Sequence, residues 1–358
     1  MVALRHGYHG RTMLSMSLTA HSNWRLGGVH DGSIRHAMAP YCYRCPLGLK
    51  PESCGVACAQ DVEEVIRTTT SGRPAAYIAE PIMGVGGFIT PPKDYFPAVA
   101  EIVRRHDAVF IADEVQTGWG RTGRKWFGIE QSGVKPDVIV AAKSLGNGHP
   151  IGATVARAEL ADSFKGSTIA TFGGNPVTMA VCRTVVDIIE KDRLADNAAV
   201  VGDHLRARLD GLAEKHAAIG DVRGMGLMQG VELVKDRKSK EPAPQVAAAV
   251  MESAKDHGLI IGKPSPPRTP TRRPTCSTRP SARRPAFDEP MVSGAGTHRC
   301  RVLRQAHDGH PRARPFQERA RPSPVRSESA GSVPGRGDHR HPRAVERGAG
   351  SRYPSPQP

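Results

Sequence analysis

The sequence predicts an α/β fold: a mostly parallel sheet with helices on both faces, followed by a smaller α/β domain. The prediction depends on short apolar runs that alternate with stretches of helical periodicity as far as Lys263. Beyond that residue the periodicity ends, and a segment rich in Arg and Pro follows. We therefore expect a large domain over residues 1–193, a partial small domain over 194–263 and a disordered tail over 264–358.

Strands and helices alternate along the part that we expect to be ordered. Apolar runs bounded by Pro, Gly or polar residues indicate buried strands, and the expected strands are 75–79, 108–112, 137–142, 227–234 and 259–261. Apolar residues spaced three and four apart indicate helices, and the expected helices are 93–106, 176–191, 194–215 and 244–257. The strand–helix–strand order favours a parallel sheet, because its crossover helices cover both faces.

Basic charge is concentrated in the tail. Residues 264–358 hold 19 Arg, no Lys and 7 acidic residues, so they carry +12 of the net charge of +15. A basic arm could bind nucleic acid through phosphates, but the lack of Lys and the scarcity of aromatic residues disfavour that partner. The tail is rich in the residues that GC-rich DNA encodes out of frame. We interpret it as frameshifted, with nucleic-acid binding as the alternative.

The composition also disfavours several other classes of protein. No apolar run approaches about 18 residues, so we expect no membrane partner, and the apolar start of the chain is too short for a signal peptide. Seven scattered cysteines do not form a disulfide framework and favour a cytoplasmic location. Cys42-x-x-Cys45 and Cys54-x-x-x-Cys58 resemble zinc-binding pairs, but we expect reduced surface thiols and no metal.

Charged residues follow three of the expected strands at the point where each strand ends. Glu80 follows the first, Asp113 and Glu114 end the second, and Lys143 follows the third. In open parallel sheets, ligands bind beyond the carboxyl ends of the strands. These side chains are therefore expected to converge on one crevice, although a solvated turn after each strand is the simpler alternative.

Lys143 and Asp113 together suggest one particular chemistry. Apolar surroundings at the end of a strand would remove water from the lysine and favour its neutral amine, the form that bonds to a carbonyl carbon as a Schiff base. Asp113 could pair with the cation of a ring nitrogen. A lysine and an aspartate in these roles are how proteins hold pyridoxal phosphate, while a salt bridge between strand ends, without chemistry, stays open.

Five motifs carry a resemblance to a known family. They are, in chain order, Tyr8-His9-Gly10-Arg11-Thr12, Ala79-Glu80-Pro81-Ile82, Ile111-Ala112-Asp113-Glu114-Val115-Gln116-Thr117-Gly118, Ala142-Lys143-Ser144-Leu145-Gly146-Asn147-Gly148 and Thr171-Phe172-Gly173-Gly174-Asn175-Pro176. Over about residues 2–263 the sequence resembles the class III (omega) aminotransferases, which are fold type I pyridoxal-phosphate enzymes.

The resemblance implies roles for the residues at the centre of these motifs. Lys143 would form the Schiff base with pyridoxal 5'-phosphate and move a proton during the reaction. Asp113 would bind the pyridinium nitrogen. Val115 would pack on one face of the ring, and Tyr8 would stack on the other.

Further residues take supporting roles by the same resemblance. Gln116 would hydrogen-bond near the ring hydroxyl, and His9 would lie near the cofactor. Glu80 would lie behind the residues that touch the cofactor. Thr171 would reach the phosphate of the neighbouring subunit, so a homodimer is implied.

The resemblance implies a ping-pong transfer of an amino group from an amino acid to a 2-oxo acid. Val85 stands where members that act on ω-amino acids carry a gating glutamate, which favours the alanine–glyoxylate branch over 4-aminobutyrate donors. Only seven residues precede Tyr8, so we expect the family's phosphate-binding loop to be missing, and its carboxylate-binding arginine is not found after Lys263. An inactive remnant and a lyase or decarboxylase are therefore kept as alternatives.

Overall fold

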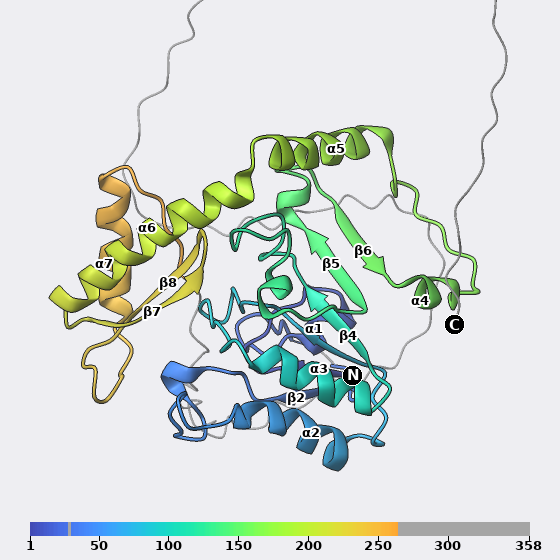
Figure 1. Ribbon diagram of the computed structural model, residues 1–358, viewed down its shortest axis with the longest axis horizontal. Coiled ribbons are helices and arrows are strands. Elements are labelled where there is room, and N and C mark those ends of the chain that lie inside the picture. Colours follow the sequence, from blue (N-terminus) through green and yellow to red (C-terminus); the bar gives the residue numbers. More distant parts are fainter. Residues whose placement is uncertain (28–29, 264–358) are drawn as a thin grey trace, which may run out of the picture. The chain divides into compact units, whose positions relative to one another are not determined.

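The computed structural model describes residues 1–27 and 30–263, in which six strands form one sheet (Figure 1). The strand order is β2-β1-β3-β4-β5-β6. All neighbours are parallel except the last pair, in which β6 runs antiparallel to β5. The strands are β1 (Val2–Leu4), β2 (Arg35–Ala37), β3 (Ala76–Ala79), β4 (Val109–Asp113), β5 (Val138–Ala142) and β6 (Gly152–Ala156).

Alternate side chains of the central strands pack on opposite faces of this sheet. On one face Tyr77 and Phe110 belong to a large buried cluster with residues of two helices, α2 (Ala57–Thr69) and α3 (Tyr95–Arg105). On the other face Ile78 packs in a smaller cluster with Leu18 of the short helix α1 (Met13–Leu18). Both faces are therefore covered, as the alternation of strands and helices predicts.

The remaining helices follow β6. They are α4 (Ala158–Asp162), α5 (Pro176–Lys191), α6 (Leu194–Lys215) and α7 (Pro244–Asp256). Helix α5 begins where expected, because the Asn175 side chain accepts a hydrogen bond from the Thr178 amide and Pro176 occupies the first turn.

A two-stranded antiparallel hairpin, β7 (Ile219–Met225) and β8 (Met228–Leu233), lies between α6 and α7 in the chain. It contacts the loop after β4, since the Leu227 amide donates to the Arg121 carbonyl over 3.1 Å. Gly226 lies so close to this loop that an added Cβ would meet the Thr122 carbonyl carbon at 2.5 Å. The loop and the hairpin are thus in direct backbone contact.

Most of the predicted elements are confirmed, and one is wrong. Residues 259–261 form no strand: Leu259 folds back to bond its amide to Ala254 O, and Ile260 is 89% exposed. No strand of the described chain pairs with this apolar triplet, and an unpaired segment cannot form a ladder. The predicted tail lies outside the described residues, and the domain boundary at residue 193 stays a prediction.

Candidate active site

The Asp113 carboxylate is buried at the carboxyl end of the sheet and is held there by two contacts. It ends β4, is 6% exposed, and its Oδ2 lies 2.7 Å from Nδ1 of His9. The backbone N–H of Val115 donates to Oδ1 over 3.2 Å. A carboxylate oxygen can only accept in this contact, so Nδ1 is the donor when His9 carries its proton there. His9 and the Val115 amide thus hold both carboxylate oxygens of Asp113 in place at the end of β4.

Glu80 directly follows β3, the strand beside β4, and its carboxylate joins three segments of the chain. Its Oε1 accepts from the backbone N–H of Tyr8 over 2.9 Å, while Oε2 accepts from Gly84 N at 3.0 Å and from Gln116 Nε2 at 3.4 Å. Burial, and to a smaller degree the nearby Asp113 carboxylate, raises the pKa of Glu80 to about 7, although His9 opposes the shift. Glu80 thus fixes the backbone of Tyr8 and the amide of Gln116.

Tyr8 and Gln116 are held from a second side as well. The Tyr8 ring packs edge-to-face on Trp24, with the ring centroids 5.4 Å apart. A Cβ at Gly84 would come within 2.5 Å of Gln116 Oε1, so only glycine leaves room for this amide. Five of the eight residues predicted for the site, Tyr8, His9, Glu80, Asp113 and Gln116, are therefore linked by hydrogen bonds around two buried carboxylates, and Val115 contacts Asp113 through its backbone.

Lys143 lies at the end of the next strand. Asp113 pairs with Val140 of β5, so Lys143 is three residues beyond the point level with Asp113. It opens a 3₁₀ turn (Lys143–Leu145) with a φ of +44°, a left-handed value that is uncommon for a residue with a Cβ. A hollow beside it is lined by Ala142, Ser144, Asn147, Gly148, His149, Pro150 and Ile151.

The expectation that the Lys143 side chain is removed from water is wrong for the described structure. The residue is exposed, and within residues 1–27 and 30–263 its side chain makes no ion pair or hydrogen bond. The turn after β5 carries it past the apolar strand and away from the packed core. Thr171 is also exposed, in the segment that leads into α5, and the described residues bring it into no contact with Asp113 or Glu80.

Glu114 is a buried carboxylate that the sequence prediction names but to which it assigns no role. It is fully buried, and it accepts hydrogen bonds from Thr117 Oγ1 at 2.5 Å and from the amides of Gly128 and Ile129 at 2.9 and 2.7 Å. Burial raises its pKa, which these donors oppose. Glu114 closes the loop that follows β4. The Asp-Glu doublet was a signal for it, since one of two adjacent residues at a strand end must face inward.

The four spaced cysteines form a separate cluster. Cys42, Cys45, Cys54 and Cys58 are free and line one hollow between proline and leucine side chains. Burial, with smaller contributions from the neighbouring thiols, raises the pKa of Cys58 to about 12. Among the described residues no group of three or more His, Cys, Asp or Glu is arranged to hold a metal ion.

The fold is shared with solved transaminase structures. A Bacillus anthracis aminotransferase superposes with a TM-score of 0.68 at 37% identity, over 73% of this chain and 60% of that one. A PLP-bound amine transaminase from an uncultivated Pseudomonas species gives a TM-score of 0.69 at 34% identity, over 73% and 62% of the two chains.

Sequence comparisons define the family. The aminotransferase class-III family model matches residues 1–278, and the chain belongs to this family. An Arabidopsis thaliana protein named alanine–glyoxylate aminotransferase 2 homolog 2, mitochondrial, is 43% identical over 74% of this chain and 54% of its own length. A leucine/methionine racemase from Thermococcus litoralis is 42% identical over 71% and 58%. The chain therefore spans little more than half the length of these relatives.

Proposed function

We propose that the protein acts as a pyridoxal-phosphate-dependent aminotransferase, moving an amino group from an amino acid such as alanine or 4-aminobutyrate to a 2-oxo acid by a ping-pong mechanism. The observation that carries the proposal is the buried Asp113 carboxylate, oriented by His9 at the end of β4, with Lys143 at the end of the adjacent parallel strand. Membership of the class III family supports it.

The donor set fits the proposed cofactor. Asp113 would accept a hydrogen bond from the protonated ring nitrogen, because its carboxylate is buried and held in one orientation by His9 and the Val115 amide. Lys143 would hold the cofactor through its ε-amino group, which no other side chain of the described chain engages. Val115 and Tyr8 would pack against the ring, and Gln116 would bond near its hydroxyl. Once bound, pyridoxal phosphate supplies an electron sink for a substrate carbanion.

Each of the residues at the candidate site would then have a definite role. Lys143 Nζ would take the proton from the carbon that bears the amino group of the donor and return one to the product. Asp113 would stabilise a positive charge at the ring nitrogen, and His9 would keep Asp113 oriented. Glu80 would hold the backbone of Tyr8 and the side chain of Gln116 in place.

We propose a homodimer in which Thr171 serves the neighbouring subunit. The segment around Thr171 exposes large apolar side chains, since Ile169 is 96% and Phe172 is 81% exposed. Such a patch marks a surface that another molecule covers. Among the described residues no helix combines the length and apolar character needed to cross a membrane, and we propose a cytoplasmic location, although the Arabidopsis relative is named mitochondrial.

Replacement of the lysine tests the function directly. Lys143→Ala should lower the rate of transamination by at least about 10²–10⁴-fold, the usual contribution of a general acid–base group. Borohydride treatment of the parent protein with pyridoxal phosphate should add the mass of the reduced cofactor to the peptide containing Lys143, and the variant should show no adduct. Lys165→Ala, on a loop lysine, is the control and should change neither measurement. Full turnover in Lys143→Ala would refute the assignment.

A second reaction is favoured by one comparison. The Thermococcus litoralis relative at 42% identity is named a racemase, which also needs a proton taken from and returned to an amino-acid carbon. Incubating L-alanine with and without a 2-oxo acid separates the two. Formation of a new amino acid only with the 2-oxo acid supports transfer, and formation of D-alanine without it supports racemisation.

A further inference from the structure

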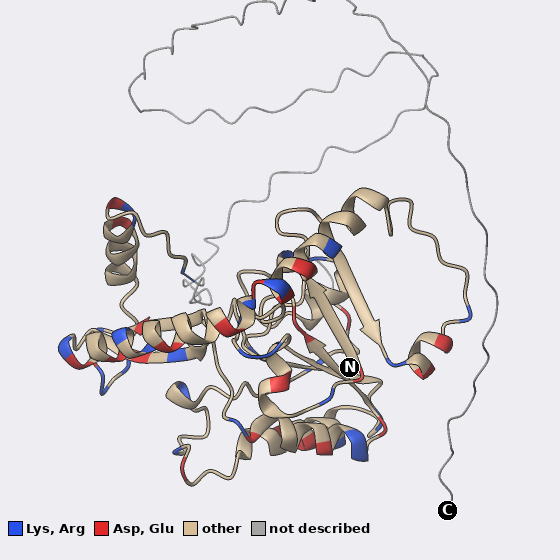
Figure 2. Ribbon diagram, turned by 45° about the horizontal axis from the view of Figure 1, so that its top comes forward, with Lys and Arg blue, Asp and Glu red and all other residues tan. Residues whose placement is uncertain are grey.

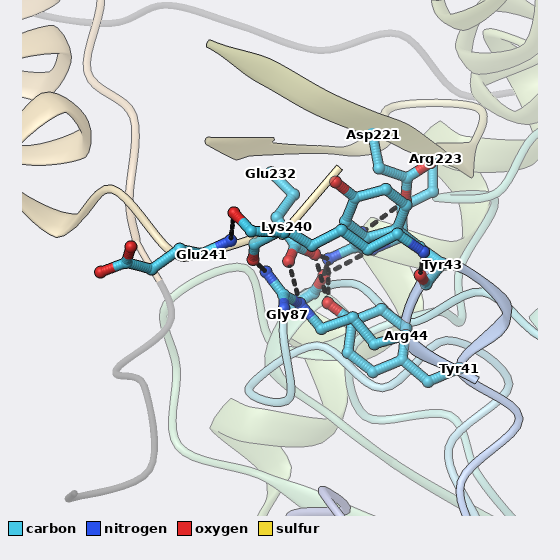
Figure 3. Close-up of polar contacts among 10 residues, drawn as sticks. Tyr41, Tyr43, Arg44, Gly87, Asp221, Arg223, Glu232, Lys240 and Glu241 are labelled. Atoms are coloured by element: carbon cyan, nitrogen blue, oxygen red, sulfur yellow. Dashed lines mark hydrogen bonds and ion pairs between the residues drawn. The ribbon is translucent and has the colours of Figure 1, made fainter. Parts of the chain in front are cut away.

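A largely buried arginine of β7, Arg223, contacts Gly87 outside the hairpin (Figure 3). The Arg223 side chain is 12% exposed, and its Nη2 lies 2.7 Å from Glu232 Oε2 on β8. Its Nη1 pairs with Asp221, and the guanidinium lies over the Tyr41 ring, 4.9 Å from the centroid. Two carboxylates and an aromatic face thus hold this cation in one orientation.

The same guanidinium reaches a turn outside the hairpin. Nε and Nη2 of Arg223 both donate to the carbonyl oxygen of Gly87, at 2.9 and 2.7 Å. Gly87 belongs to the turn 84–88. The Gly87 amide closes this turn by donating to Gly84 O over 3.1 Å. The hairpin presses on this turn at a second point, since a Cβ at Gly230 would meet Phe88 Cβ at 2.8 Å.

The other end of the turn 84–88 touches the site residues. The Gly84 amide donates to Glu80 Oε2, and the space left by the missing Cβ of Gly84 is filled by the Gln116 amide. A displacement of the turn would therefore remove a donor from Glu80 and the wall behind Gln116. Glu80 in turn binds the Tyr8 amide.

We propose that Arg223 is a positioning residue of the candidate active site: by gripping Gly87 it fixes the turn 84–88 and, through that turn, Glu80 and Gln116. The consequence for turnover rests on the proposed function, whereas the positioning of the turn does not. The simpler alternative is that Arg223 only neutralises the carboxylates of the hairpin. Arg44 provides the matched comparison, because it also pairs with Glu232 but bonds to Lys240 O instead of the turn.

The test compares Arg223→Gln with Arg44→Gln in the full chain without added cofactor. Hydrogen exchange of the amides of Gly87 and Ile89 should become about tenfold faster in Arg223→Gln, because the turn loses two hydrogen bonds from a charged group. Exchange in Arg44→Gln should match the parent. Equal acceleration in both variants, or none in Arg223→Gln, would overturn the proposal.

A second measurement, the pKa of Glu80, tests whether the effect of Arg223 extends from the turn 84–88 to this carboxyl group. The Glu80 carboxyl, which faces His9 and Asp113, can be titrated by carbon-13 NMR, with Glu80→Gln identifying its signal. Its pKa should rise above about 7 in Arg223→Gln, because the Gly84 N–H that favours the ionised form is displaced. An unchanged pKa in a folded Arg223→Gln would contradict the transmission to Glu80.

Two further variants keep the test decisive if Arg223→Gln does not fold. Arg223→Lys retains the charge, but an ammonium cannot reproduce the planar fork that serves Gly87 and both carboxylates, so the exchange of the turn should still accelerate. Gly230→Ala keeps Arg223 and pushes on Phe88, and it should accelerate the same amides. Normal exchange in both would overturn the proposal. Faster exchange in a protein that never transfers amino groups would refute the proposed function and leave the positioning role intact.

Discussion

Two regions of the same sheet differ in how their apolar residues are covered. Around β1, β3 and β4, side chains such as Ile66 of α2 and Tyr77 of β3 are completely buried between the sheet and the helices α2 and α3. From β6 to α5, residues of the same kind face outward: Val155 is 60% and Ile169 is 96% exposed. Strands β5 and β6 also carry no charged residue (Figure 2).

The difference separates the two ends of the candidate site. Asp113, Glu80 and His9 belong to the covered region, where both carboxylates are bound by donors, although Nε2 of His9 is buried without a hydrogen-bond partner among the described residues. Lys143 and Thr171 belong to the uncovered region, where the described chain supplies no partner for either side chain. The contacts at the carboxylate end thus come from the described residues, and the second copy proposed above would face the lysine end.

The largest loss of stability should come from truncating an isoleucine of the covered region. The matched truncation in the uncovered region should have almost no effect. Ile66→Ala removes a fully buried side chain of α2 and should lower the free energy of unfolding by about 2–5 kcal/mol. Ile169→Ala, in the uncovered region, should change it by less than about 0.5 kcal/mol in the monomer. Urea unfolding at low protein concentration measures both. Similar losses for the two variants would show that the regions do not differ as described.

The pH dependence of stability should reveal the buried carboxyl group of the covered region. Glu80 has a folded pKa of about 7 against an ordinary value of 4.5, so the folded state binds the proton more tightly. Stability should therefore fall by about 3 kcal/mol as the pH rises from 4.5 to 7 and stay level above that. In Glu80→Gln this contribution should vanish, which denaturant unfolding across that range would detect. Glu64→Gln, on the exposed side of α2, should keep the parent slope.

A smaller loss is expected from the carboxylate that closes the loop after β4. Glu114→Gln places an amide N–H₂ among three donors, so the free energy of unfolding should fall by about 1–3 kcal/mol. Thermal unfolding monitored by circular dichroism provides the measurement. If Glu114→Gln were as stable as the Glu64→Gln control, Glu114 would not hold the loop.

The smallest effect should come from a surface pair at the edge of the covered region. His106 Nε2 lies 2.9 Å from Glu63 Oε1, and this hydrogen bond raises the pKa of the imidazole. Because the folded pKa is the higher one, the stabilisation is complete below about pH 6.5 and is lost as the pH rises through the folded value. His106→Gln should remove less than about 1 kcal/mol at pH 5.5 and almost nothing at pH 9. A larger loss at pH 9 than at pH 5.5 would contradict this assignment.

Parts of the fold with strong periodicity could be predicted from the sequence. Helices α5 and α6 begin and end at the predicted residues, and β3, β4 and β5 lie within one residue of their predicted bounds. Strands of three residues, such as β1, are too short to show a pattern. Strand β7 was missed because Gly220 and Gly224 interrupt its apolar residues, and because β8 is the only strand of the described chain that pairs with it.

The sequence by itself determined which polar groups end the strands, because the alternation of apolar and charged residues is a local property. It was sufficient to select Glu80, Asp113 and Lys143 and to indicate the aminotransferase family. Only the tertiary structure decided that Arg223, more than a hundred residues from Gly87, holds the turn behind Glu80. It also decided that Lys143 is left exposed. Both depend on which distant segments pack together, and burial is a property of that packing and not of any single stretch of chain.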